Sequence, residues 1–117
     1  MDFYKRLGIV CNGVPKGKVI TYGQAALLCG FPKNARQVGY GLKKERAGKV
    51  PAHRVVNSQG VLSGAASFEY IDMQRLLLEG EGVEVSVDNK VDLKKYGWKN
   101  TLEEAEVFRE TFRKLGI

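Results

Sequence analysis

Residues 50–56 read Val-Pro-Ala-His-Arg-Val-Val and contain the only histidine of this 117-residue chain. A histidine that follows a proline in a short turn between valines is typical of a catalytic turn, in which the imidazole acts as a general base or activates a nucleophile. The residue directly before it is Ala52, whose methyl group has no reactive atom. The pattern therefore indicates a site whose histidine has no nucleophile beside it.

The composition limits which partners could act at this turn. A formal net charge of +6 favours a polyanionic partner such as nucleic acid. Two cysteines and one histidine lack the close spacing of metal ligands, so we predict no metal and no cofactor, and we expect Cys11 and Cys29 to be reduced. The chain has neither a long apolar run nor an apolar signal segment near its start, so we expect a cytoplasmic protein that does not enter a membrane.

The turn must be held by the rest of the chain, and in most of the chain the apolar residues recur with the period of a helix. The pattern predicts a mostly α-helical protein with small β-hairpins, forming a single domain over residues 1–117. Thr21 with Gln24, and Thr101 with Glu104, have the spacing of a helix-capping box. The expected helices cover residues 3–12, 22–29 and 35–45, a stretch from Ser67 to Gly80, and residues 102–115.

The second and third helices are separated by a short Gly-Phe-Pro-Lys turn, which resembles a helix-turn-helix. We expect Asn34 to cap the third helix, with Val38 and Leu42 facing inward. β-Branched runs on either side of residues 57–60 predict a hairpin that would form a small wing, and alternation over residues 83–93 predicts a second hairpin. The expected fold is therefore a winged helix-turn-helix-like domain.

Four motifs together resemble the DNA-binding domain of the O6-alkylguanine-DNA alkyltransferases. They are Thr-Tyr-Gly-Gln-Ala-Ala from residue 21, the segment 30–42, the turn 50–60 with its Pro-Ala-His-Arg, and the Leu- and Glu-Gly-rich segment near residue 80. The resemblance covers about residues 3–82. In that family the turn reads Pro-Cys-His-Arg, and the cysteine takes the alkyl group from the guanine. Here that acceptor position is Ala52, which is similar to the alkyltransferase-like proteins.

The resemblance implies a non-enzymatic sensor that flips O6-alkylguanine out of double-stranded DNA and flags it for nucleotide excision repair. We expect the sensor to act as a monomer. His53 and Glu79 match the residues that activate the cysteine in the transferases, and they would be an idle remnant here. By the same resemblance Arg36 enters the base stack and Tyr22 helps to rotate a phosphate. The implied DNA-binding residues are Arg36, Tyr22, Thr21, Ala35, Gly39 and Lys33.

The resemblance also places a lesion pocket between the turn and the segment that starts at Ser63. Its expected residues are Pro51, Ala52, His53, Arg54, Val55, Ser63, Gly64, Ala65 and Ala66. Two features depart from the transferases: alanines stand at 65 and 66 where Tyr-Ser is common, and an asparagine that often precedes the turn is missing. The loss of the cysteine also removes volume, so adducts larger than methyl could be accepted.

Two other functions stay open on the residues alone. One is an enzyme, either a transferase with another nucleophile or a hydrolase in which His53 activates water. The other is a winged-helix transcription factor, which would read a DNA sequence rather than a lesion. Label transfer from a methylated duplex would distinguish the first, and a strong preference for one operator sequence would distinguish the second.

Overall fold

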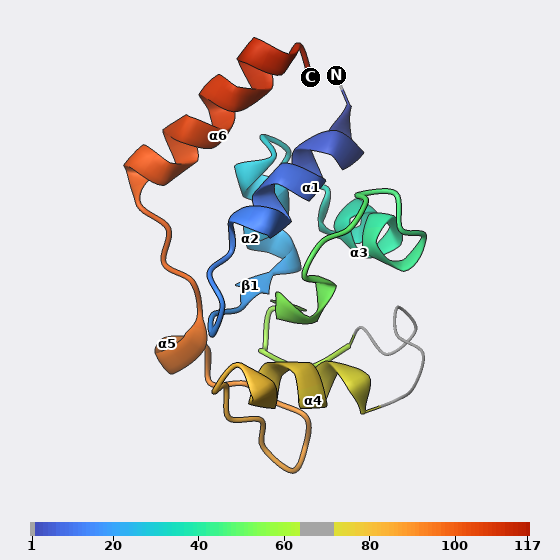
Figure 1. The fold of residues 1–117 in the computed structure, drawn as a ribbon, viewed down its shortest axis with the longest axis vertical. Helices are drawn as coiled ribbons and strands as arrows, with labels where there is room; N and C mark the ends of the chain where they lie inside the picture. The colour runs from blue at the N-terminus through green and yellow to red at the C-terminus, as the bar shows by residue number, and fades with distance from the viewer. Residues whose placement is uncertain (1, 64–71) are drawn as a thin grey trace.

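The computed structural model describes residues 2–63 and 72–117, and most of its regular structure is helical (Figure 1). The mostly α-helical class predicted from the sequence is confirmed. In chain order the elements are α1 (Phe3–Gly13), β1 (Ile20–Thr21), α2 (Tyr22–Leu28), α3 (Ala35–Lys43), the 3-10 helix η1 (Ala52–Arg54), β2 (Val55–Val56), α4 (Met73–Gly80), α5 (Leu93–Tyr96) and α6 (Leu102–Leu115).

Side-chain caps explain where two of the predicted helices begin. The Thr21 hydroxyl accepts the backbone N–H of Gln24 at 3.1 Å, and Thr101 with Glu104 forms a complete capping box at the start of α6. The predicted box is confirmed at Thr101, whereas at Thr21 only the hydroxyl cap forms, because the Gln24 amide nitrogen donates to Trp98 and Asn100 instead. The expected cap at Asn34 is wrong, because its side chain bonds the Gln37 side chain at 2.8 Å instead of a backbone N–H.

The two short strands pair with each other in parallel, with Ile20 opposite Val55 and Thr21 opposite Val56. The predicted wing hairpin around residues 57–60 is therefore wrong. Its turn exists, since the Asn57 carboxamide oxygen accepts the backbone N–H groups of Gln59 and Val61, each at 2.9 Å. The strand before that turn pairs with β1, more than 30 residues away, rather than with the strand expected after the turn.

The pair β1–β2 lies between two hydrophobic clusters. Ile20 and Val55 belong to a larger cluster formed with α1, α2, α3 and α6, while Val56 belongs to a smaller one with Leu78, Val83 and other residues. Successive side chains of a strand point to opposite faces, so a strand of two residues can place one side chain in each cluster. The turn η1 leads directly into β2, and this pairing fixes the position of the turn between the clusters.

The second predicted hairpin is also wrong, and the fourth helix differs from its prediction. Residues 86–90 form a tight turn in which Ser86 and Lys90 are bonded, but Lys90 bridges to Val61. The expected cap at Ser67 lies outside the described residues, and the described helix α4 begins at Met73. Of its three leucines only Leu78 is buried, since Leu76 and Leu77 are 56% and 37% exposed.

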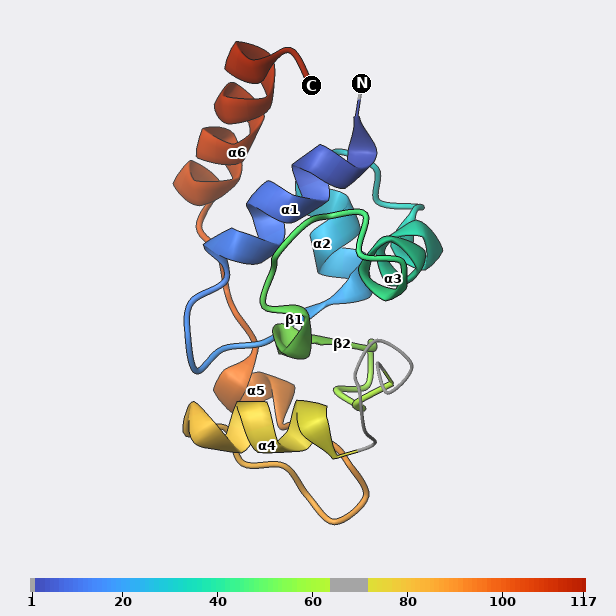
Figure 2. The same cartoon turned by 45° about the vertical axis from the view of Figure 1, so that its right-hand side comes forward.

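Helix α3 lies on the opposite side of α1 and α2 from helix α6, as Figures 1 and 2 both show. The predicted inward positions Val38 and Leu42 of α3 are buried. On α6, Phe108 and Phe112 are buried, whereas Leu102 and Leu115 at its two ends are exposed. Trp98 packs edge to face on Phe108. Within the described ranges no helix combines the length and apolar character needed to cross a membrane.

Candidate nucleic-acid interface

The turn that carries Ala52 and His53 is closed by its own backbone. The N–H of Ala52 bonds the carbonyl of Val50 at 2.8 Å, and the N–H of Arg54 bonds the carbonyl of Pro51 at 2.9 Å. The bond from Arg54, together with one from the N–H of Val55 to the carbonyl of Ala52, forms the single turn of 3-10 helix between Ala52 and Arg54. The side chains of His53 and Arg54 both reach one carboxylate.

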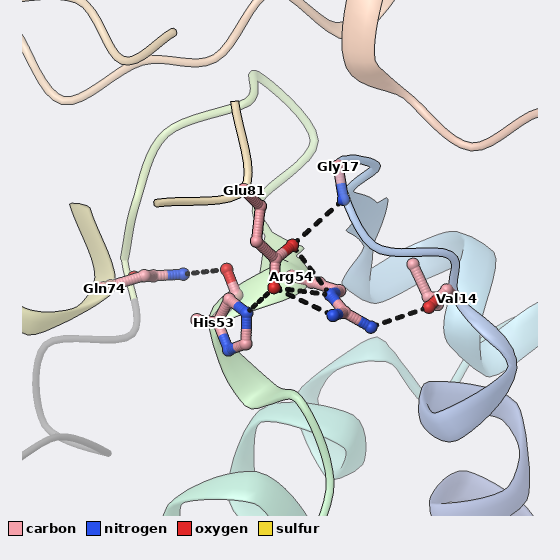
Figure 3. A network of polar contacts seen from close by, with 6 residues as sticks. All are labelled: Val14, Gly17, His53, Arg54, Gln74 and Glu81. Atoms are coloured by element: carbon pink, nitrogen blue, oxygen red, sulfur yellow. Dashed lines mark hydrogen bonds and ion pairs between the residues drawn. The ribbon is translucent and has the colours of Figure 1, made fainter. Parts of the chain in front are cut away.

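That carboxylate belongs to Glu81 (Figure 3). His53 Nε2 lies 2.7 Å from Glu81 Oε2, and Arg54 donates from Nε and from a terminal nitrogen at 2.8–3.2 Å. The backbone N–H of Gly17 is a further donor, at 3.0 Å from Oε1. A second terminal nitrogen of Arg54 reaches the carbonyl of Val14 at 2.9 Å. The carboxylate therefore ties η1 to the loop after α1.

The prediction that Glu79 partners His53 is wrong. Glu79 is exposed on the last turn of α4, which ends at Gly80. Gly82 has a φ of 87°, and the chain turns back so that the N–H of Val83 bonds the carbonyl of Leu78 at 3.0 Å. Because of this reversal Glu81, rather than Glu79, faces η1. Glu-Gly occurs twice in succession at 79–82, and only the position of the helix end distinguishes the two glutamates.

The surroundings of Glu81 strongly favour its ionised form. Burial by itself would raise the pKa of this carboxyl, but hydrogen bonds from Arg54, His53 and the backbone of Gly17 outweigh it and lower the pKa to about 2. Glu81 is therefore negatively charged at neutral pH. Its side chain is only 9% exposed, so the charge depends on these donors.

A buried glutamine, which no motif of the sequence indicated, holds the turn from the other side. Gln74 of α4 is 2% exposed, and its amide nitrogen donates to the carbonyls of His53 and Val55 at 3.2 and 3.0 Å. Figure 3 shows Gln74 and Glu81 approaching the turn from different directions. The backbone of η1 and the side chains of His53 and Arg54 are thus both fixed.

A cavity of about 800 Å³ opens beside the turn. Ala52 and His53 lie in its wall, together with residues from the end of α3, the loop after it and α4. Two other residues expected in the lesion pocket do not line the cavity. Arg54 binds Glu81, and Val55 is buried in the larger cluster. The expected pocket residues Gly64, Ala65 and Ala66 lie outside the described residues. The described lining comprises Gly41, Leu42, Glu45, Ala47, Gly48, Lys49, Val50, Ala52, His53, Met73 and Leu77.

Several of the residues expected to contact DNA are gathered at the junction of α2 and α3. A side-chain carbon at Gly39 would lie 3.8 Å from the Tyr22 ring, and the Ser63 hydroxyl lies 3.5 Å from the Tyr22 hydroxyl. Lys33 and Arg36 are exposed at the start of α3, where Ala35 is the first helical residue.

Gly41 has a different role from Gly39. A side-chain carbon at Gly41 would lie 2.8 Å from the ring of Tyr4, so a glycine is needed for α3 to pack against α1. Gly39 has no such close neighbour, since the Tyr22 ring is the nearest group to a side-chain carbon placed there. The glycine at 41 therefore serves an internal helix–helix contact.

Both cysteines are free thiols in the larger cluster, as expected. Burial raises the pKa of each to about 12. A thiol must lose its proton to become a good nucleophile, so neither is activated at neutral pH.

The family model for the 6-O-methylguanine DNA methyltransferase DNA-binding domain matches residues 2–83. The DNA base-flipping protein of Vibrio parahaemolyticus is 43% identical over 99 residues, which cover 84% of this chain and 97% of that protein. The DNA base-flipping protein of Escherichia coli is 41% identical over 98 residues, covering 83% of this chain and 74% of that protein. The chain therefore belongs to the family of this DNA-binding domain, in its alkyltransferase-like group.

A solved structure gives the same result at the level of the fold. The crystal structure of Atl1 of Schizosaccharomyces pombe in complex with damaged DNA containing O6-carboxymethylguanine has a TM-score of 0.75 and 38% identity. The match covers 84% of this chain and 95% of that one. The resemblance inferred from the motifs is confirmed. Helix α6 lies entirely outside the residues that the family model matches.

Proposed function

We propose that this chain is a non-enzymatic sensor of DNA damage that binds O6-alkylguanine in duplex DNA after rotating the nucleotide out of the helix. One observation carries the proposal. Ala52 lies in the wall of the cavity, beside a His53 that Glu81 holds in place, where the transferases have their cysteine. A methyl group can neither lose a proton nor accept an alkyl group, so the site can hold a lesion without repairing it.

Two residues outside the wall of the cavity suit the rotation of a nucleotide toward it. Rotation out of the stack costs a few kcal/mol, and less for a damaged base, because alkylation weakens its pairing. Arg36 is exposed at the start of α3, and its planar cation can stack on bases and bond the orphaned partner. Tyr22, beside Gly39 and Ser63, is the residue we assign to the flanking phosphate.

The volume of the cavity favours adducts larger than methyl. About 800 Å³ lies beside Ala52, which has a smaller side chain than the cysteine it replaces. The Atl1 relative was crystallised in complex with damaged DNA containing O6-carboxymethylguanine. We propose that this chain likewise accepts substituents longer than one carbon.

A rival transferase would need another nucleophile, and the two cysteines do not supply one. Cys11 and Cys29 are buried thiols outside the cavity wall, and burial raises the pKa of each to about 12, so neither forms the thiolate that a methyl transfer needs. His53 could still activate water in a hydrolase. The first experiment is designed to detect both reactions.

A duplex with one labelled O6-methylguanine tests the proposal. We expect the label to stay on the DNA while a protein–DNA complex forms, and an unlabelled, unmodified duplex serves as the binding control. Label on the protein would demonstrate a transferase, and labelled methanol would demonstrate a hydrolase. Either result would contradict a binding-only function.

Because the adduct stays in place, another activity has to remove it, and we propose that the bound complex recruits nucleotide excision repair. We further propose that the protein acts as a monomeric single domain over residues 1–117. In a reconstituted excision reaction, added protein should increase incision next to the adduct. Unchanged incision would contradict the recruitment alone and leave lesion binding untouched.

A further inference from the structure

Helix α3 ends in a turn that places one arginine back against the helix. Glu45 has a φ of 55°, in the left-handed region, and the N–H of Arg46 bonds the carbonyl of Gly41 at 2.8 Å. This is the arrangement of a Schellman motif, with a non-glycine residue in the left-handed position. A side-chain carbon at Gly8 would lie 2.5 Å from the Ala47 carbonyl oxygen, so the following loop packs closely on α1.

The guanidinium of Arg46 lies over two tyrosine rings. Its central carbon is 5.9 Å from the ring centroid of Tyr4, on α1, and 5.5 Å from that of Tyr40, on α3. Arg46 is nevertheless exposed, and Tyr40 is 45% exposed. Within residues 2–63 and 72–117 its guanidinium forms no hydrogen bond or ion pair with another side chain or carbonyl. The rings therefore hold the cation in place while its N–H groups remain available.

Arg46 stands at the end of a basic face of α3. Arg36, Tyr40 and Lys43 are spaced i, i+4 and i+7, so they lie on one side of the helix, and all three are exposed. The buried positions Val38 and Leu42 are on the opposite side. This outer face is the one that the proposed function assigns to DNA, and Arg46 extends it beyond the last helical residue.

We propose that Arg46 is a backbone-binding residue that contacts a phosphate of the duplex, held in position by Tyr4 and Tyr40. The inference rests on the proposed function, which supplies the DNA. An arginine can stack its flat face on aromatic rings while the edge of its guanidinium donates to a phosphate oxygen. Because the side chain is already ordered, it loses less conformational freedom on binding than a free surface lysine or arginine.

A phosphate contact has a measurable signature that internal packing lacks. Each phosphate neutralised by a protein cation steepens the plot of log affinity against log salt concentration by about 0.9. A contact to a phosphate carries no information on the base, so its loss weakens binding to damaged and undamaged DNA alike. A purely structural contact of Arg46 with the two tyrosines would instead alter the thermal stability and leave the salt dependence unchanged.

The experiment measures affinity over a range of salt for methylated and unmodified duplexes with Arg46→Ala, Arg46→Lys and the control Arg113→Ala. Arg113 is an exposed arginine on α6 that pairs with Glu110, on the opposite side of the molecule from α3. Arg46→Ala should weaken binding to both duplexes about tenfold and reduce the salt slope by about 0.9. Arg46→Lys should keep the slope but lose part of the affinity, because an ammonium cannot stack as a plane. Arg113→Ala should change neither.

An unchanged salt slope in Arg46→Ala would overturn the inference, as would an equal change in slope in Arg113→Ala. The unmodified duplex makes this test independent of lesion recognition. If the wild-type protein failed to prefer the methylated duplex, the proposed function would fall, while the change in slope would still decide whether Arg46 contacts a phosphate.

Discussion

In the turn η1, His53 and Arg54 both bind the carboxylate of Glu81, and their side chains are only 14% and 16% exposed. On helix α3, Arg36 is exposed, and within the described part of the chain it has no hydrogen-bonded or ion-paired partner. The turn is therefore ordered before any ligand arrives, whereas Arg36 stays free to move into a base stack. This difference separates the residues that shape the pocket from the residue proposed to open the DNA.

The largest effect should follow from removal of the carboxylate that orders the turn. Glu81→Ala leaves Arg54 and His53 without their partner in a mostly buried place, so we expect the free energy of unfolding to fall by about 3–5 kcal/mol. Urea denaturation measures it. The matched control is Glu79→Ala, which removes an exposed carboxylate two residues away and should change the stability by less than about 0.5 kcal/mol. Equal losses in the two variants would contradict the role assigned to Glu81.

The same carboxylate predicts how stability depends on pH. Its pKa is about 2 in the folded protein against an ordinary value of 4.5, so the unfolded chain binds the proton more readily. Stability from this group is complete above about pH 4.5 and is lost as the pH falls toward 2, by a total on the order of 3 kcal/mol.

Glu81→Gln isolates that contribution, since the amide does not titrate. We expect the difference in unfolding free energy between wild type and Glu81→Gln to shrink steadily from pH 5 to the lowest pH at which both still fold. A constant difference over this range would show that the negative charge of Glu81 does not stabilise the folded protein.

A smaller effect, confined to DNA binding, is expected on α3. Arg36→Ala should weaken binding to the lesion duplex by at least about 1 kcal/mol, because no side chain then fills the vacated stack. Its unfolding free energy should stay within about 0.5 kcal/mol of wild type, since Arg36 is exposed. Fluorescence titration and urea denaturation of the same sample provide both numbers. An unchanged dissociation constant would contradict the assignment of Arg36 to the stack.

The sequence was a good guide wherever structure is set locally. Helix periodicity and the caps at Thr21 and Thr101 predicted α1, α2 and α6 because a capping bond spans only three residues. The strands escaped prediction because each has two residues, and β2 pairs with a segment 35 positions earlier rather than with its neighbour. A turn at Asn57–Gly60 was recognised, but a turn alone does not determine which strand pairs with which.

The site shows the same limit. The motif at 50–56 identified the turn, but the choice between Glu79 and Glu81 depended on where α4 ends, and helix ends are poorly marked in sequence. Gln74 gave no signal, because a glutamine on a helix is usually solvated and only the packing of α4 against η1 buries it. The position of Arg46 could not be predicted either, since its two tyrosine neighbours come from two different helices.

The central claim is that the chain binds alkylated guanine in preference to normal DNA and leaves it unchanged. A competition titration at one fixed salt concentration tests it, with duplexes of identical sequence that carry O6-methylguanine, a bulkier O6 adduct or unmodified guanine. We predict that both modified duplexes bind more tightly than the unmodified one, by at least about tenfold, because weakened pairing lowers the cost of flipping. Equal affinity for all three duplexes would contradict the account.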